Sequence, residues 1–101
     1  MKVDSIVILN LVSPKQRFLG KLLEISPAGV TVRGVDLEAF EDWINHVSAQ
    51  EESGVQATTT FFPLHRLEKM ILDESLGAIP SLSNSFLARV GSPIEKHLEN
   101  G

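Results

Sequence analysis

The stretch RFLGKLLEISPAGVTVRGV, residues 17–35, constrains the fold of this chain more than any other segment. Its apolar side chains recur at the two-residue period of β-strands. SPAG (26–29) interrupts it with proline second and glycine fourth, as in a type I turn. The segment therefore predicts an antiparallel hairpin of strands 17–25 and 30–35. Gly20 inside the first strand predicts a sharp bend, which short strands need to close a barrel.

Further strand-forming runs lie on both sides of this hairpin. VDSIVILNLV (3–12) is rich in Val, Ile and Leu and ends at a Ser-Pro turn, so it predicts a first strand. VQATTTFF (55–62) predicts a fourth strand and LEKMIL (67–72) a fifth, with a turn that begins at Pro63 between them. Five short sequential strands predict a small antiparallel barrel.

The hydrophobic period changes from strand to helix spacing at Asp36, which is a suitable N-cap. The acidic residues that follow complement the positive end of a helix dipole. We predict a helix over 37–49, inserted between the third and fourth strands. Trp43 borders its apolar stripe and is expected to pack in the core; presentation of Trp43 to a partner is the alternative. The stripe consists of Leu37, Phe40, Ile44 and Val47.

The chain has 101 residues, 43% of them hydrophobic and 22% charged, which matches one globular unit with a modest core. We predict a barrel over residues 1–75. Residues 76–101 are predicted to form an irregular or partly helical extension, because LGAIPSL contains a glycine and a proline. Phe86 and Leu87 would be costly to expose, so docking of the extension on the barrel is expected.

Several classes of site are excluded by composition. The chain has no cysteine, and His46, His65 and His97 lack zinc-site spacing, so we predict no metal and no cofactor. No nucleophile elbow and no Gly-rich phosphate loop occurs, so the chain is predicted not to be an enzyme. Asp4 and Asn10 interrupt the N-terminal apolar run, and no run of about 18 apolar residues occurs. These features predict a cytoplasmic protein with no membrane segment.

Two short blocks resemble the motifs of the Sm-like family. Phe18, Gly20 and Leu22 lie where the first Sm motif has an apolar residue, a glycine and an apolar residue along its bent strand. FFPLHRLEKMIL resembles the second motif, and His65 falls on the histidine of the Hfq-type turn. The C-terminal domain of ribosome maturation factor P has a similar rhythm. Leu64 replaces the lysine of the Hfq turn, and SPAGV replaces the polar loop with which Sm proteins hold RNA bases.

The resemblance implies a five-stranded SH3/Sm-like antiparallel barrel that assembles as a homo-oligomeric ring. In such a ring the fourth strand of one subunit pairs with the fifth strand of the next, because both strands have unpaired edges. The edge residues expected here are Val55, Ala57, Thr59 and Phe61 on the fourth strand, with Leu67, Lys69 and Ile71 on the fifth.

The resemblance also implies single-stranded RNA as a partner, bound at the turn between the last two strands. His65 and Arg66 would grip a phosphate or stack on a base there. The basic residues Arg17, Lys21 and Arg33 would join them from the first three strands. The alternative for each is structural, with Arg66 paired to a carboxylate such as Glu68.

The net charge of −4 opposes general nucleic-acid binding, but this charge is unevenly distributed. Residues 36–54 contain six acidic and no basic side chains, whereas residues 1–35 contain five basic and two acidic ones. The acidic helix or the C-terminal extension would suit a protein partner. A protein-interaction or scaffold module without RNA binding is therefore the alternative function.

Overall fold

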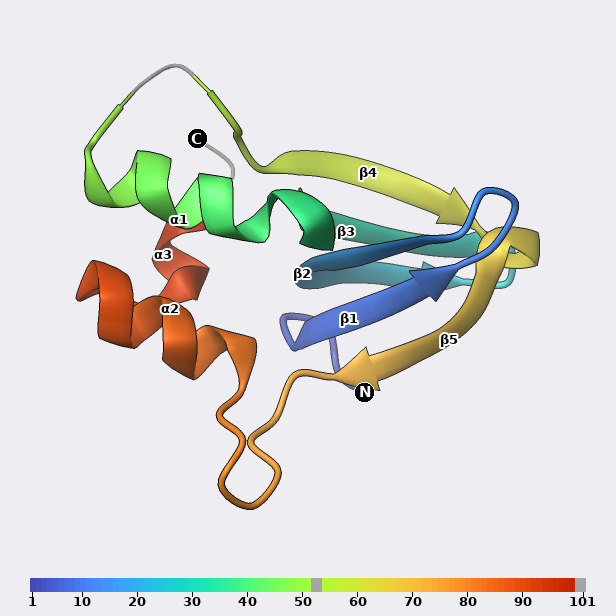
Figure 1. Ribbon diagram of the computed structural model, residues 1–101. Helices are drawn as coiled ribbons and strands as arrows, with labels where there is room; N and C mark the ends of the chain where they lie inside the picture. The colour runs from blue at the N-terminus through green and yellow to red at the C-terminus, as the bar shows by residue number, and fades with distance from the viewer. Residues whose placement is uncertain (52–53, 100–101) are drawn as a thin grey trace.

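The computed structural model of this chain describes residues 1–51 and 54–99. Its strands form one antiparallel sheet in the order β4-β3-β2-β1-β5 (Figure 1). The fold class predicted from the sequence, a mainly β chain of five antiparallel strands with a helix after the third, is confirmed. The strands are β1 (Ile6–Leu11), β2 (Gln16–Ser26), β3 (Gly29–Asp36), β4 (Thr58–Pro63) and β5 (Leu67–Leu72).

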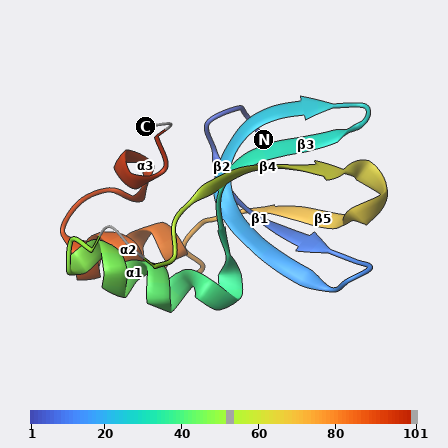
Figure 2. The same cartoon turned by 90° about the horizontal axis from the view of Figure 1, so that it is seen from above.

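The sheet is strongly curved (Figure 2), and two facing glycines allow this. Gly20 and Gly34 are register partners on β2 and β3. A Cβ on Gly20 would lie 2.7 Å from the carbonyl oxygen of Arg33. A Cβ on Gly34 would overlap the carbonyl oxygen of Leu19. Only glycine permits so close a backbone approach. Within the described chain the predicted barrel is not closed, because β4 and β5 are the two edges of the sheet.

The concave face of the sheet encloses an inner core. Alternation along each strand directs every second side chain to this face. The rings of Phe18 and Phe62 meet edge to face there, with their centroids 5.2 Å apart. The inner core consists of Val7, Leu9, Leu11, Phe18, Leu22, Val30, Val32 and Phe62.

Helices cover part of the opposite face and create a second, helical core. The 3-10 turn η1 (Leu37–Ala39) and helix α1 (Phe40–Ser48) follow β3 directly. Asp36 is the N-cap of η1, since its carboxylate accepts a hydrogen bond from the Glu38 backbone N–H at 2.9 Å. Trp43 is 3% exposed, which confirms core packing over presentation to a partner. The helical core consists of Ile6, Leu19, Val35, Phe40, Trp43, Ile44, Phe86, Ile94 and Leu98.

The C-terminal extension contains two helices, so of the two predicted alternatives, irregular or partly helical, the structure has the second. Helix α2 (Leu82–Val90) begins at Ser81, whose hydroxyl accepts from the Asn84 N–H at 3.0 Å, and ends at Gly91 in the left-handed region. Helix α3 (Ile94–His97) follows. Phe86 is fully buried in the helical core, so the extension is docked. Burial of this one ring stabilises helical turns that local signals alone leave marginal.

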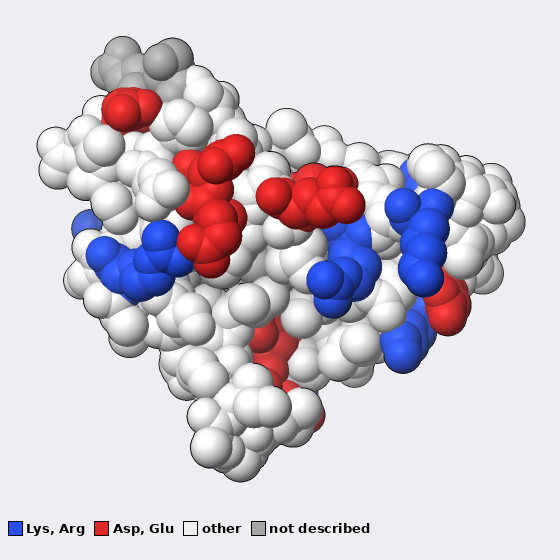
Figure 3. All heavy atoms as spheres, viewed as in Figure 1, with Lys and Arg blue, Asp and Glu red and all other residues white. Residues whose placement is uncertain are grey.

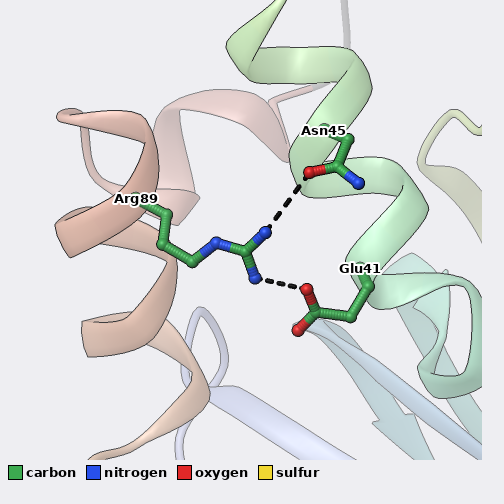
Figure 4. Close-up of polar contacts among 3 residues, drawn as sticks. All are labelled: Glu41, Asn45 and Arg89. Carbon is green, nitrogen blue, oxygen red and sulfur yellow. Dashed lines mark hydrogen bonds and ion pairs between the residues drawn. The ribbon is translucent and has the colours of Figure 1, made fainter.

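Polar contacts also join α2 to α1 at the surface (Figure 4). Arg89 donates hydrogen bonds to the carboxylate of Glu41 and, at 3.3 Å, to the side-chain oxygen of Asn45. Exposed ion pairs of this kind contribute about 1 kcal/mol or less. The apolar contacts beneath them therefore account for most of the docking.

Candidate binding surfaces

Arg66, in the 3-10 turn η2 (Leu64–Arg66) between β4 and β5, clamps this turn to the β1–β2 loop. Its Nε donates to the carbonyl of Val12 at 3.0 Å, and its Nη2 donates to the carbonyl of Pro14 at 2.9 Å. Nη2 also reaches the side-chain oxygen of Gln16 at 3.3 Å. The partners of Arg66 are therefore mainly backbone carbonyls, and not the carboxylate of Glu68 that the sequence suggested.

The clamp gives Arg66 and His65 different roles in the same turn. Arg66 is half-buried and uses three of its N–H groups within the protein, so it holds the loop in place. His65 is exposed, and it makes no hydrogen bond or ion pair with any residue in the described ranges. Of the two predicted contacts in the turn, His65 is thus the one whose polar atoms are all unengaged within the described residues.

Three residues form one rung across the convex face of the sheet. Asn10 on β1 is the register partner of Arg17 on β2 and of Lys69 on β5. Opposed side chains on one face have Cβ atoms about 5 Å apart, so two cations flank Asn10. A hollow of about 310 Å³ lies over the rung and is also lined by Lys15. We call Asn10, Lys15, Arg17 and Lys69 the basic rung.

The basic rung has an excess of positive charge. Lys15, Arg17 and Lys69 form no ion pair within residues 1–51 and 54–99, although Glu68 lines the same hollow. The Oδ1 atom of Asn10 is buried without a hydrogen-bond partner there. Figure 3 shows one side of the molecule, on which basic groups are separated by acidic and neutral surface. A local anion site fits this distribution better than an extended basic surface does.

The other two basic residues predicted to contact RNA, Lys21 and Arg33, lie apart from the basic rung. They are register partners on β2 and β3. Lys21 Nζ lies 3.7 Å from a carboxylate oxygen of Asp4, and Arg33 donates to the Thr59 hydroxyl at 3.4 Å. Leu19, between Arg17 and Lys21 in β2, is buried under the helices. The helical core thus separates Arg17 from the pair.

The predicted edge residues on the fourth strand divide into two sets. Thr59 and Phe61 lie in β4, and Phe61 is 50% exposed. Val55 and Ala57 precede β4 and pack against the helical core, so the prediction that they lie on the edge strand is wrong. The chain returning from α1 covers apolar helix surface before it joins the sheet, and this packing overrides the strand propensity of residues 55–57.

The predicted edge residues on the fifth strand all lie in β5. Leu67 is half-buried and packs against the inner core, whereas Ile71 is 40% exposed on the opposite face. Lys69 points to the same face as Ile71 and belongs to the basic rung. An unpaired strand with exposed apolar side chains is a template for pairing with another strand.

Comparisons with protein-family models, with curated proteins and with solved structures found no match to this chain. In the part of the chain that the structure describes, no three His, Cys, Asp or Glu side chains gather in a way that would hold a metal ion. No helix within the same residues has the length and apolar character needed to cross a membrane.

Proposed function

We propose that this protein is a non-enzymatic, Sm-like binding module whose basic rung contacts the phosphates of single-stranded RNA. The observation that supports this is the shared hollow of Lys15, Arg17 and Lys69, which lack carboxylate partners among the described residues. Phosphate oxygens would supply the missing negative charge.

In this proposal Arg66 is a positioning residue. Its hydrogen bonds to Val12 and Pro14 hold the β1–β2 loop, which carries Lys15. The same bonds bring the η2 turn, with its exposed His65, to the loop end of the sheet. A base adjacent to the bound phosphates would therefore lie within reach of the imidazole.

Self-association would strengthen a site that has only three cations. Pairing of β4 of one copy with β5 of the next would satisfy the unpaired backbone groups of both edge strands and give a homo-oligomeric ring. Lys69 projects from the face of the sheet, so edge pairing leaves it available. Each copy would then present one basic rung to the same RNA strand, and the contacts would add through avidity. We place this assembly in the cytoplasm.

The test measures fluorescence anisotropy of a labelled, short A/U-rich single-stranded RNA at several salt concentrations, with light scattering of the same samples. Three phosphate contacts predict that log Kd rises with log salt with a slope of about 2. The double variant Arg17→Gln/Lys69→Gln should lose most of the affinity. The matched control Lys2→Gln/Lys96→Gln removes the same charge from exposed positions elsewhere. If both double variants lost the same affinity for RNA, net charge alone would explain the loss, and the proposed site would be contradicted.

A second candidate function is a protein-interaction module, supported by the turn that follows β5. The turn projects from the body of the molecule (Figure 1), and Leu76 and Ile79 are 64% and 69% exposed on it. Their backbone groups bond each other at 2.9 and 3.0 Å, so the turn is ordered. An ordered pair of exposed apolar side chains is typical of protein contacts. If this function holds, Leu76→Ser/Ile79→Ser should reduce association in light scattering, whereas Arg17→Gln/Lys69→Gln should not.

A further inference from the structure

A second hollow, of about 320 Å³, lies on the helical side of the molecule. It is bounded by β3, the end of α1, the chain that leads into β4, and α3. Arg33 contributes the positive charge, His46 and His97 contribute imidazoles, and Val47 and Val55 contribute apolar surface. The basic rung shares no residue with this hollow.

Arg33 lacks the partner that a half-buried guanidinium normally has. Its Nε atom is buried and has no hydrogen-bond acceptor within the described chain. Its one side-chain hydrogen bond there is the 3.4 Å contact of Nη1 with the Thr59 hydroxyl. None of the ion pairs formed by the described residues includes Arg33. Burying a charge without a counter-charge is costly, so the guanidinium favours occupation of the hollow by an anion.

The hollow also contains a carboxylate, that of Glu51. Its carboxylate oxygen lies 3.4 Å from Nε2 of His46, and Glu51 forms no ion pair with Arg33. His97 bonds the Ser92 hydroxyl at 2.7 Å through Nε2. Burial, and to a smaller extent the Lys96 cation, lowers the pKa of His97 below its usual range, so its ring is uncharged at neutral pH. Arg33 is therefore the cation available to an incoming anion.

The wall of the hollow combines apolar side chains, among them Val47 and Val55, with polar ones such as His46 and Gln56. Val47 and Val55 line the hollow together with Trp43. Gly54 lies against the ring of His46, where a Cβ would come within 2.5 Å of Nε2, and its φ of +109° also favours glycine. The volume is at the lower end of that of small-molecule sites, which are about 300–1,000 Å³. A single-ring molecule fits it better than a nucleotide does.

From this geometry we infer that the hollow binds a small ligand with a carboxylate on Arg33 and an apolar ring or chain along Val47 and Val55. A carboxylate presents two oxygens to the planar fork of a guanidinium, and it would supply the counter-charge that Arg33 lacks among the described residues. The site and its ligand are independent of the proposed RNA function, since the hollow shares no residue with the basic rung.

The test uses Trp43, the chain's one tryptophan, as a fluorescent reporter within the hollow. Benzoate is titrated into the full chain, with benzamide as a neutral probe of the same shape. Benzoate should cause a saturable change in emission, and benzamide should bind at least about tenfold more weakly, because charged hydrogen bonds contribute more than neutral ones. Arg33→Gln should weaken the binding of benzoate to the level of benzamide binding. The matched control is Lys21→Gln, because Lys21 is the register partner of Arg33 but lies outside the hollow. This variant should keep the original affinity for benzoate.

A measurement on the unaltered protein guards against misfolding of the Arg33 variant. The Nε–H signal of Arg33 in a ¹H–¹⁵N spectrum should shift with benzoate and not with benzamide. The inference is overturned if benzoate gives no saturable response, if benzamide binds equally well, or if the Arg33 signal is unmoved while Trp43 responds. An equal loss in the Lys21 variant would also overturn it, because the effect would then come from overall charge.

Discussion

The two cores of this small protein are built in opposite ways. The inner core draws nearly all its side chains from the consecutive strands β1, β2 and β3, with Phe62 added from β4. The helical core joins segments from Ile6 to Leu98, almost the whole length of the chain. Leu19 and Val35, which face the helices, alternate along β2 and β3 with residues that face the inner core. The same strands therefore carry both cores.

This difference indicates how stability is distributed. Local hairpins can assemble the inner core with short loops, and such contacts have a small entropic cost. The helical core depends on docking of α2 and α3, which requires ordering the residues after β5. Its loss would expose Trp43 and Phe40 and would leave Leu19 and Val35 partly uncovered. We therefore expect substitutions and deletions in the helical core to lower the stability of the protein most.

The largest expected effect comes from truncation after Glu74, which removes Phe86, Ile94 and Leu98. Deletion of one large buried side chain costs about 2–5 kcal/mol, so three such losses approach the whole stability of about 5–15 kcal/mol of a small domain. The truncated chain should lack a cooperative thermal transition in circular dichroism. The full chain with Leu87→Ala, a half-exposed position in the same helix, should stay within about 0.5 kcal/mol of the original. An unchanged melting transition after truncation would show that docking contributes nothing.

The next effect compares equivalent changes in the two cores. Phe86→Ala and Phe62→Ala should each lower the free energy of unfolding by about 3–5 kcal/mol, because both rings are buried. Only Phe86→Ala should alter the fluorescence of folded Trp43, whose ring centroid lies 5.0 Å from that of Phe86. Chemical denaturation is followed by Trp43 emission and by circular dichroism. Coincident curves are expected; an early transition in emission alone would mean that the helical core unfolds independently.

The smallest effect is a pH dependence of the helical core. Burial lowers the pKa of His97 in the folded state below the value of 6.5 in the unfolded chain. The unfolded state therefore binds the proton more readily, so stability is complete above pH 6.5 and falls as the pH drops toward the folded pKa. Denaturation midpoints on both sides of pH 6.5 should differ less in His97→Gln than in the original chain. His65→Gln, an exposed position, should keep the full difference, and the same change in both variants would exclude His97 as the cause.

The candidate sites illustrate the limit of sequence patterns. The turn at Pro63 and the presence of His65 and Arg66 in it were predictable, because proline and the change between strand segments are local signals. The hydrogen-bond partners of Arg66 were not predictable, because Val12 and Pro14 lie 54 and 52 residues away along the chain. No local pattern singled out Asn10 either, and it gains significance only through its register with Arg17 and Lys69.

The sequence by itself determined the five strands, the bend at Gly20, the hairpin turn at 26–29 and the helix after Asp36, because each depends on side-chain period, turn residues or capping within a few positions. The tertiary structure alone decided that the sheet stays open and that α2 buries Phe86. It also decided which basic residues gather on the basic rung and which one enters the second hollow. These outcomes depend on strand register and on contacts between distant segments, whose free energies do not appear in any short stretch of the chain.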